Sequence, residues 1–123
     1  MIIKNGVDII EVNRIKENIY KFGDKFLNRM FTEKEIEYCE SKKVQKYQSY
    51  AGRFAAKEAI FKALSDYIDN KYEIEWKDIE ILNDKDGKPK VCLHGKLKEI
   101  SCNIDVSISH IKSTAIASAI ASF

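Results

Sequence analysis

The apolar residues of this chain recur with a helical period in its first half and alternate with polar residues in its second half. Spacings of three and four residues, which place side chains on one face of a helix, predict two short helices followed by two longer ones. Thr32 and Glu35 have the spacing of a capping box, so the third helix is expected to begin there. The expected helices cover residues 12–22, 24–30, 32–43 and 44–68.

Alternating apolar residues and turn residues predict strands on either side of this helical region. Residues 83–89 read as a turn, and the stretch 115–121 alternates alanine with larger residues, which suggests a second hairpin with one closely packed face. One strand, then helices, then strands is the order of an α+β domain. We therefore expect a single domain over residues 1–123, with an antiparallel sheet packed against helices. The expected strands cover residues 7–10, 79–82, 90–93, 106–110 and 115–121.

Glu58 departs most clearly from the pattern of the long helix. At about 100° per residue, seven apolar residues fall on one stripe, and Glu58 projects between Ala51 and Phe54 inside it. A half-buried carboxylate is costly unless it gains a partner, which nearby Lys62 or a metal ion could supply. The stripe consists of Tyr47, Tyr50, Ala51, Phe54, Phe61, Leu64 and Ile68.

Asp8 is a second carboxylate in an apolar setting, because it lies within the expected strand near the N-terminus. Taken singly, Asp8 is more often a strand-edge or capping residue, and Glu58 can pair with Lys62 four residues later. Taken together, two such acids suit a hard divalent cation. Mg²⁺ is commonly bound through one or two carboxylates, with waters and phosphate oxygens completing its shell. Both interpretations stay open from the residues alone.

The composition limits the classes of protein to consider. The chain has 123 residues, 45% of them hydrophobic, and no apolar run approaches the roughly 20 residues of a membrane span. The N-terminus lacks the basic region and apolar core of a signal peptide. Cys39, Cys92 and Cys102 are odd in number and lack metal-ligand spacing. We therefore expect a cytoplasmic protein with reduced thiols and no membrane partner.

The formal net charge of +2 hides a local excess of basic residues. Residues 14–29 carry five basic and two acidic side chains, a net charge of +3. A patch of one sign steers charged partners more than it determines a fold. Nucleic acid is not the expected partner, because lysine outnumbers arginine 18 to 3 and no aromatic residues alternate with a basic stretch.

Further residues could contact phosphate groups, although each has an ordinary structural interpretation. Lys57 and Lys62 flank the unusual carboxylate of the long helix; a solvated lysine face accounts equally well for Lys57, whereas Lys62 borders the apolar stripe. Arg53 could anchor a phosphate or form a surface ion pair. Gly87 fits a hairpin turn, and a single histidine at a strand end, such as His110, is more often structural than catalytic.

In combination, these segments resemble the holo-acyl-carrier-protein synthases, the short family of 4′-phosphopantetheinyl transferases. Residues 6–15, GVDIIEVNRI, resemble the family's opening motif, and residues 53–59, RFAAKEA, are similar to its central signature. The resemblance covers nearly the whole chain. One departure is Ser65, where the family usually has glycine. The later matching segments are residues 78–81, 86–89 and 106–110.

This resemblance implies transfer of 4′-phosphopantetheine from coenzyme A to a serine of apo acyl carrier protein, with release of adenosine 3′,5′-bisphosphate, in support of fatty acid biosynthesis. Asp8 and Glu58 match the family's Mg²⁺ ligands, and the metal would offset charge on the leaving phosphate. Lys62 would stabilise the same charge. Glu58, or a metal-bound water beside it, would take the serine proton. The residues expected to bind coenzyme A are Arg53, Lys57, Lys62, Gly87 and His110.

The resemblance also implies protein partners. The family's carrier proteins are acidic, which gives the basic segment a purpose, and its members of this length assemble as homotrimers with sites between subunits. The alanine-rich last strand is compatible with burial in such an interface. Four basic residues fall within about 80° on a continuous helical projection, although Gly23 is expected to break that helix. These carrier-protein-binding candidates are Arg14, Lys21, Lys25 and Arg29.

Two other classes of function would use some of the same residues. A metal-dependent phosphohydrolase could use the carboxylate pair, but should convert coenzyme A without any carrier protein. A non-enzymatic domain that binds carrier proteins would need only the basic face. It would leave Glu58 unexplained unless Lys62 pairs with it.

Overall fold

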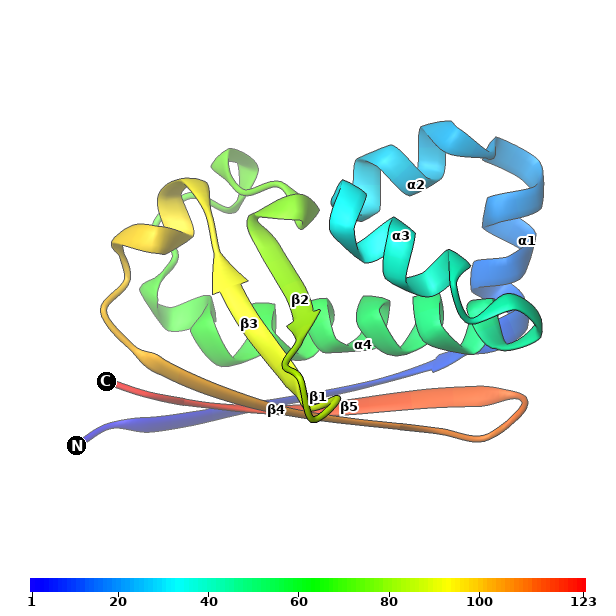
Figure 1. Ribbon diagram of the computed structural model, residues 1–123. Coiled ribbons are helices and arrows are strands. Elements are labelled where there is room, and N and C mark those ends of the chain that lie inside the picture. Colours follow the sequence, from blue (N-terminus) through cyan, green and yellow to red (C-terminus); the bar gives the residue numbers. More distant parts are fainter.

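The computed structural model describes residues 1–123 as an α+β fold in which one long helix lies between two layers. A three-stranded antiparallel sheet runs along one side of helix α4, and three shorter helices and a two-stranded hairpin lie along the other (Figure 1). The expected fold class is confirmed. The helices are α1 Val12–Phe22, α2 Asp24–Met30, α3 Glu33–Glu40 and α4 Lys46–Leu64, and the strands are β1 Ile3–Glu11, β2 Ile79–Asn83, β3 Pro89–Leu93, β4 Asn103–His110 and β5 Thr114–Ser122.

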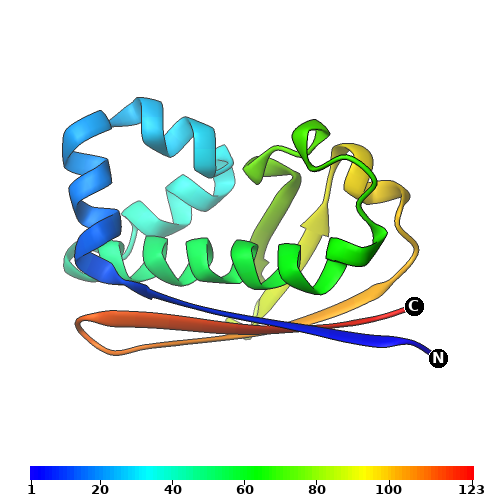
Figure 2. The same cartoon turned by 180° about the vertical axis from the view of Figure 1, so that it is seen from behind.

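The larger sheet has the strand order β1-β5-β4, so the C-terminal strand lies at its centre. The expected hairpin of β4 and β5 is present, and β5 also pairs antiparallel with β1 along the whole of that strand. Because pairing begins at Ile3 opposite Ser122, β1 is longer than the expected strand at 7–10. The two ends of the chain meet at one end of the sheet (Figure 2), where Ile2 and Phe123 exchange backbone hydrogen bonds.

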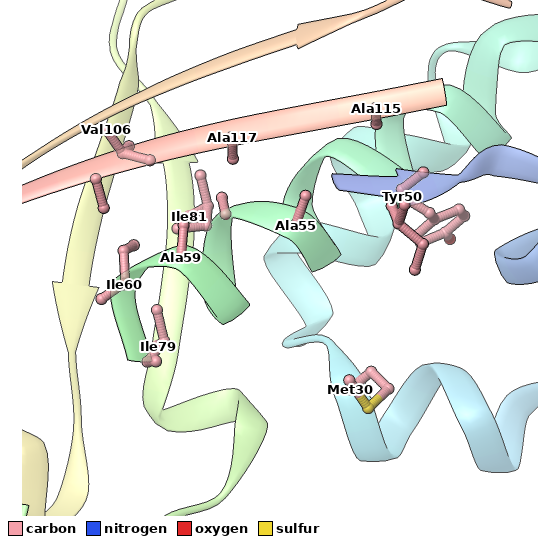
Figure 3. Close-up of a cluster of buried hydrophobic side chains, with 14 of the residues drawn as sticks. Met30, Tyr50, Ala55, Ala59, Ile60, Ile79, Ile81, Val106, Ala115 and Ala117 are labelled. Carbon is pink, nitrogen blue, oxygen red and sulfur yellow. The ribbon is translucent and has the colours of Figure 1, made fainter. Parts of the chain in front are cut away.

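One face of β5 consists of alanines that pack against helix α4. Ala115, Ala117, Ala119 and Ala121 are buried, and Ala55 and Ala59 of α4 point toward the strand (Figure 3). The closely packed face expected from the alternation of alanine is therefore present. This alanine face packs within the chain, so a subunit interface at β5 would use the other face of the strand, where Ile116 and Ile120 are exposed.

Helix α4 is buried nearly all round, which corrects the expectation of one apolar stripe. Residues outside that stripe, among them Ala55, Ala59 and Ile60, are fully buried because the helix has a layer on each side. The helix is also shorter than expected. Single 3₁₀ turns at Lys43–Gln45 and Ser65–Tyr67 replace its two ends.

The helical corner follows the sequence signals closely. Gly23 separates α1 from α2 with a φ of 57°, in the region that favours glycine. The capping box of Thr32 and Glu35 is present at the start of α3. Ser65, in place of the family's usual glycine, is accommodated without strain because its φ is −56°, and its hydroxyl donates to the Lys62 carbonyl. None of the helices combines the length and apolar character that a membrane crossing requires.

Candidate functional site

Three of the residues expected to carry the chemistry meet where β1 crosses helix α4. Lys62 reaches from the helix to the strand, with its Nζ 3.3 Å from Asp8 Oδ1 and 2.9 Å from the Val7 carbonyl oxygen. Asp8 is mostly buried and Lys62 is half exposed, with side-chain exposures of 19% and 52%. Glu58 lies one helical turn before Lys62 and is half-buried. The helix and the strand thus bring one ammonium group and two carboxylates together.

Gly6 explains why the strand and the helix approach so closely. A Cβ atom built at Gly6 would lie 1.9 Å from the Ala59 carbonyl oxygen and 3.0 Å from the Ala63 nitrogen. Only glycine on the strand, facing small residues on the helix, permits this contact. Two residues further along β1, Asp8 faces the same side and is brought within reach of Lys62.

The electrostatic setting of Glu58 is unfavourable to its charged form. Partial burial raises the pKa of the Glu58 carboxyl, and the negative charge of Asp8 raises this pKa further, while Lys62 opposes both effects. A carboxyl group with a raised pKa is a better proton acceptor near neutral pH than an ordinary one. The same repulsion between two carboxylates favours a bound cation.

Glu58 opens onto a hollow of about 340 Å³, here called the carboxylate hollow. Three of its seven lining residues are aromatic, and two of them, Phe61 and Trp76, have ring centroids 6.0 Å apart. The hollow is lined by Glu58, Phe61, Lys71, Tyr72, Ile74, Glu75 and Trp76.

Arg53, Gly87 and His110 line a different hollow, here called the arginine hollow, of about 350 Å³. The Arg53 guanidinium lies 4.0 Å from the Tyr38 ring and donates to Asn83, and its side chain is held almost fully buried. Its Nε is buried and has no hydrogen-bond partner within the chain. Three of the five residues expected to bind coenzyme A are therefore gathered here, apart from Lys62 and Glu58.

Lys57 lies in neither hollow, so its expected role as a phosphate contact needs correction. The side chain is completely buried, and its ammonium group donates to Glu35 at 2.8 Å and to the carbonyl oxygens of Trp76 and Ile79. Three acceptors occupy its three donors, which leaves none for a ligand. The alternative of a solvated lysine face is also wrong. The sequence could not reveal this, because Glu35 lies 22 residues away.

The four basic carrier-protein candidates are all exposed, on α1 and α2. Lys25 and Arg29 rim a groove of about 530 Å³, here called the basic groove, whose floor is apolar. Because Gly23 breaks the helix, the four side chains follow a corner rather than one helical face. The basic groove is lined by Asn18, Phe22, Lys25, Phe26, Arg29, Met30, Phe54 and Trp76.

Three residues of these hollows were not identified from the sequence. Trp76 lines both the carboxylate hollow and the basic groove, and its being the only tryptophan of the chain was an available signal. Asn83 begins the turn segment, a place where asparagine is common for structural reasons. Tyr38 lies within an ordinary helical pattern, and nothing in the sequence sets it apart.

The groups available for a metal ion are the two carboxylates alone. No cluster of three or more histidine, cysteine or acidic side chains in the chain could enclose a cation. This suits an ion that completes its shell with water and substrate oxygens, as Mg²⁺ does, and does not suit a closed structural site. The raised pKa of Glu58 beside Asp8 is the feature of this chain that fits such an ion.

Comparisons with known proteins all point to one family. Residues 5–119 match the family model described as the 4′-phosphopantetheinyl transferase superfamily. A holo-[acyl-carrier-protein] synthase of Ruminiclostridium cellulolyticum is 51% identical over 122 residues, covering 95% of this chain and 90% of that protein. A protein of the same name from Caldicellulosiruptor saccharolyticus is 50% identical over 126 residues, covering 98% of this chain and 97% of its own length.

Solved structures agree in the arrangement of the chain. The Chronobacterium ammoniagenes ACPS–CoA complex superposes with a TM-score of 0.85 at 26% identity, covering 98% of this chain and 97% of that one. The Helicobacter pylori holo-[acyl-carrier-protein] synthase in complex with coenzyme A has a TM-score of 0.82 at 34% identity, covering 96% of this chain and 99% of that one.

Proposed function

The chain belongs to the 4′-phosphopantetheinyl transferase superfamily as an enzyme of the holo-[acyl-carrier-protein] synthase family, and we propose Mg²⁺-dependent modification of an apo acyl carrier protein as its reaction. The 4′-phosphopantetheine group of coenzyme A is transferred to a serine hydroxyl, and adenosine 3′,5′-bisphosphate is released. The observation that carries this proposal is the meeting of Asp8, Glu58 and Lys62 at the crossing of β1 and α4.

The reaction requires a proton acceptor for the serine and a positive charge for the leaving group. As the serine Oγ–phosphorus bond forms, the bond from phosphorus to the oxygen of adenosine 3′,5′-bisphosphate breaks, and that oxygen takes the electron pair. Glu58, or a water beside it, accepts the serine proton, because Glu58 is the carboxylate that lines the hollow open to an acceptor. Lys62, held by Asp8 and the Val7 carbonyl, stabilises the charge on the leaving phosphate.

Asp8 and Glu58 are the residues that would hold Mg²⁺. When bound, this ion would neutralise part of the negative charge of the coenzyme A pyrophosphate. Both carboxylates would have to be ionised to hold the cation, and Lys62 adds its own positive charge beside the leaving phosphate.

Arg53, Gly87 and His110 bind the nucleotide end of coenzyme A in this proposal. Arg53 lines the arginine hollow with a planar guanidinium, a group that suits a phosphate. The exposed cations of α1 and α2 bind the acidic carrier protein, because complementary charge speeds association and orients the partner.

A homotrimer is the proposed assembly, with each site shared between subunits. The support is the outer face of the larger sheet, where Val7, Ile9, Ile116 and Ile120 form an exposed apolar surface on neighbouring strands. Apolar patches of this kind mark protein interfaces more often than free surface. We further place the enzyme in the cytoplasm, serving fatty acid biosynthesis; all three of its cysteines are free thiols.

One experiment tests the reaction against its alternatives. The protein is incubated with apo acyl carrier protein, coenzyme A and Mg²⁺, and the intact mass of the carrier protein is measured. The expected result is a carrier protein heavier by one phosphopantetheine group, and none when Mg²⁺ is chelated. Conversion of coenzyme A without a carrier protein would indicate a phosphohydrolase, and a stable complex without conversion would indicate a binding module.

A further inference from the structure

A buried ion pair joins helices α3 and α4, and its side chains are hydrogen-bonded to the backbone at the start of strand β2. Glu35 and Lys57 are both fully buried, and their side chains meet at 2.8 Å. Lys57 also donates to the Trp76 and Ile79 carbonyl oxygens, and the second carboxylate oxygen of Glu35 accepts the Ile81 backbone N–H at 2.9 Å. Neither residue lines any of the three hollows.

Every hydrogen bond from this pair to the hairpin side falls within residues 76–81. Desolvation lowers the pKa of the Lys57 amine, and the charge of Glu35 opposes that change. An uncompensated charge would be costly at this depth, so each partner requires the other. The pair therefore fixes the backbone of Trp76 relative to α4, the helix that carries Glu58 and Lys62.

The Trp76 indole is the wall shared by two hollows. On one side it lines the carboxylate hollow with Glu58, and on the other it lines the basic groove with Lys25 and Arg29. The indole stacks on Phe54 with ring centroids 6.2 Å apart and an interplanar angle of 29°, so α4 supports it from below. An acceptor that contacts the basic groove and also reaches Glu58 would lie against this ring, because Trp76 lines both hollows.

We propose that Trp76 is a specificity-determining residue for the carrier-protein substrate and that the buried Glu35–Lys57 pair positions it. This inference rests on the proposed function. The carrier protein contacts the basic groove through its acidic surface, and the segment around its acceptor serine crosses the indole to reach Glu58. Trp76 contacts the acceptor and not the nucleotide, because it is absent from the arginine hollow.

Steady-state kinetics of Trp76 variants test the specificity role. With coenzyme A saturating, Trp76→Ala should raise the Michaelis constant for apo carrier protein about tenfold, the usual cost of truncating a central aromatic contact. The Michaelis constant for coenzyme A should be unchanged, and Trp76→Phe should retain most of the wild-type value. Tyr67→Ala is the matched control, since Tyr67 is an aromatic residue that lines none of the three hollows, and it should leave both Michaelis constants unchanged.

Tryptophan fluorescence tests the positioning role, because Trp76 is the only tryptophan in the chain. Lys57→Met, which keeps most of the side-chain volume, should shift the emission to longer wavelength while far-ultraviolet circular dichroism stays native. It should also raise the Michaelis constant for a tryptophan-free apo carrier protein. Glu35→Gln, which preserves the shape of the partner, serves as the second variant.

Each outcome decides one part of the proposal. An unchanged carrier-protein Michaelis constant in Trp76→Ala overturns the specificity role. A folded Lys57→Met or Glu35→Gln protein with wild-type emission and kinetics overturns the positioning role. If neither of these variants folds, the pair is purely structural and the positioning role is rejected. A wild-type protein that leaves the carrier protein's mass unchanged would instead contradict the proposed function, before any variant is compared.

Discussion

Lys62 forms its ion pair with Asp8 on the neighbouring strand, at 3.3 Å, and not with Glu58 one turn away on its own helix. The spacing of Glu58 and Lys62 would allow an ion pair within the helix. The Lys62 ammonium group instead donates to the Asp8 carboxylate and to the Val7 carbonyl oxygen, both on β1. Glu58 is consequently left beside a second negative charge. This arrangement favours a cation site over a structural pair.

We expect Asp8 and Glu58 to act as one unit in turnover. Asp8→Asn and Glu58→Gln should each lower kcat/KM about 10²-fold or more, because each removes charge that holds the cation and orients the phosphate. The double variant should be little worse than either single variant, since residues of one catalytic unit are not additive. Turnover of all three proteins at saturating Mg²⁺ provides the measurement. Losses that multiply in the double variant would mean that the two carboxylates act independently.

Stability should depend on pH through Glu58. The folded-state pKa of Glu58 is raised, so the folded protein binds a proton more readily than the unfolded chain, and stability falls as pH rises above the ordinary carboxyl pKa and through the raised one. Metal-free Glu58→Gln should therefore melt slightly above the wild type at pH 7 and equally with it near pH 4, below both values. Thermal melts at the two pH values measure this.

The control for that experiment is Glu73→Gln, which removes an exposed carboxylate on the 3₁₀ turn Lys71–Glu73, outside helix α4. It should leave the pH dependence of the melting temperature as in the wild type. Mg²⁺ with coenzyme A should raise the melting temperature of the wild type and not that of Glu58→Gln. A Glu58→Gln protein that is destabilised, yet active with Mg²⁺, would falsify the metal-site interpretation.

Local patterns in the sequence predicted local structure well and distant pairings poorly. The capping box at Thr32, the break at Gly23 and the alanine face of β5 all depend on neighbours in the chain, and all were predicted. The burial of Lys57 depends on Glu35, a residue that is distant in the sequence and comes close only in the tertiary fold. Periodicity also assigned α4 one apolar stripe, whereas Ala55, Ala59 and Ile60 outside that stripe are buried against a second layer.

The functional residues divide in the same way. The apolar surroundings of Asp8 and Glu58 marked them in the sequence, since a carboxylate inside an apolar pattern is unusual at any position. Tyr38 and Asn83 act by orienting Arg53, and such supporting roles leave no periodic signal. Trp76 was overlooked because its two hollows are formed by segments distant in the chain.

Charge reversal on the basic corner should weaken the use of carrier protein alone. Arg14→Glu or Arg29→Glu should lower kcat/KM for apo carrier protein about fivefold or more at low ionic strength, with less effect at high salt. Binding of coenzyme A should be unchanged. Kinetics at two ionic strengths test this, with Lys98→Glu as a control. Lys98 belongs to the 3₁₀ segment Gly95–Glu99, which lies at the end of the molecule opposite α1 (Figure 1). An unchanged Michaelis constant for carrier protein in both variants would contradict the proposed docking surface.

The outer face of the larger sheet should determine the oligomeric state. Ile9 and Ile116 lie opposite each other on β1 and β5 and are exposed in the single chain. Burying a glutamate in a subunit interface is costly, so Ile9→Glu or Ile116→Glu should dissociate a trimer and lower its activity. Light scattering measures the mass of each protein. Val44→Glu, at a 90% exposed position on a 3₁₀ turn, should remain assembled. A wild-type monomer with full activity would refute the shared site.

Arg53 and Glu58 face different hollows from the same helix, and this separation has a genetic consequence. Glu58 follows Arg53 by five residues in α4, which separates the two side chains by about 140° around the helix and by about 7.5 Å along its axis. If one coenzyme A molecule contacts Arg53 of one subunit and Glu58 of the next, a subunit defective in one residue and a subunit defective in the other can together form an intact site. Arg53→Ala and Glu58→Gln proteins, each inactive alone, should regain activity when their subunits are exchanged in equal amounts. Random mixing would leave about a quarter of the sites with both residues intact, so two damaged copies of the gene in one cell should complement.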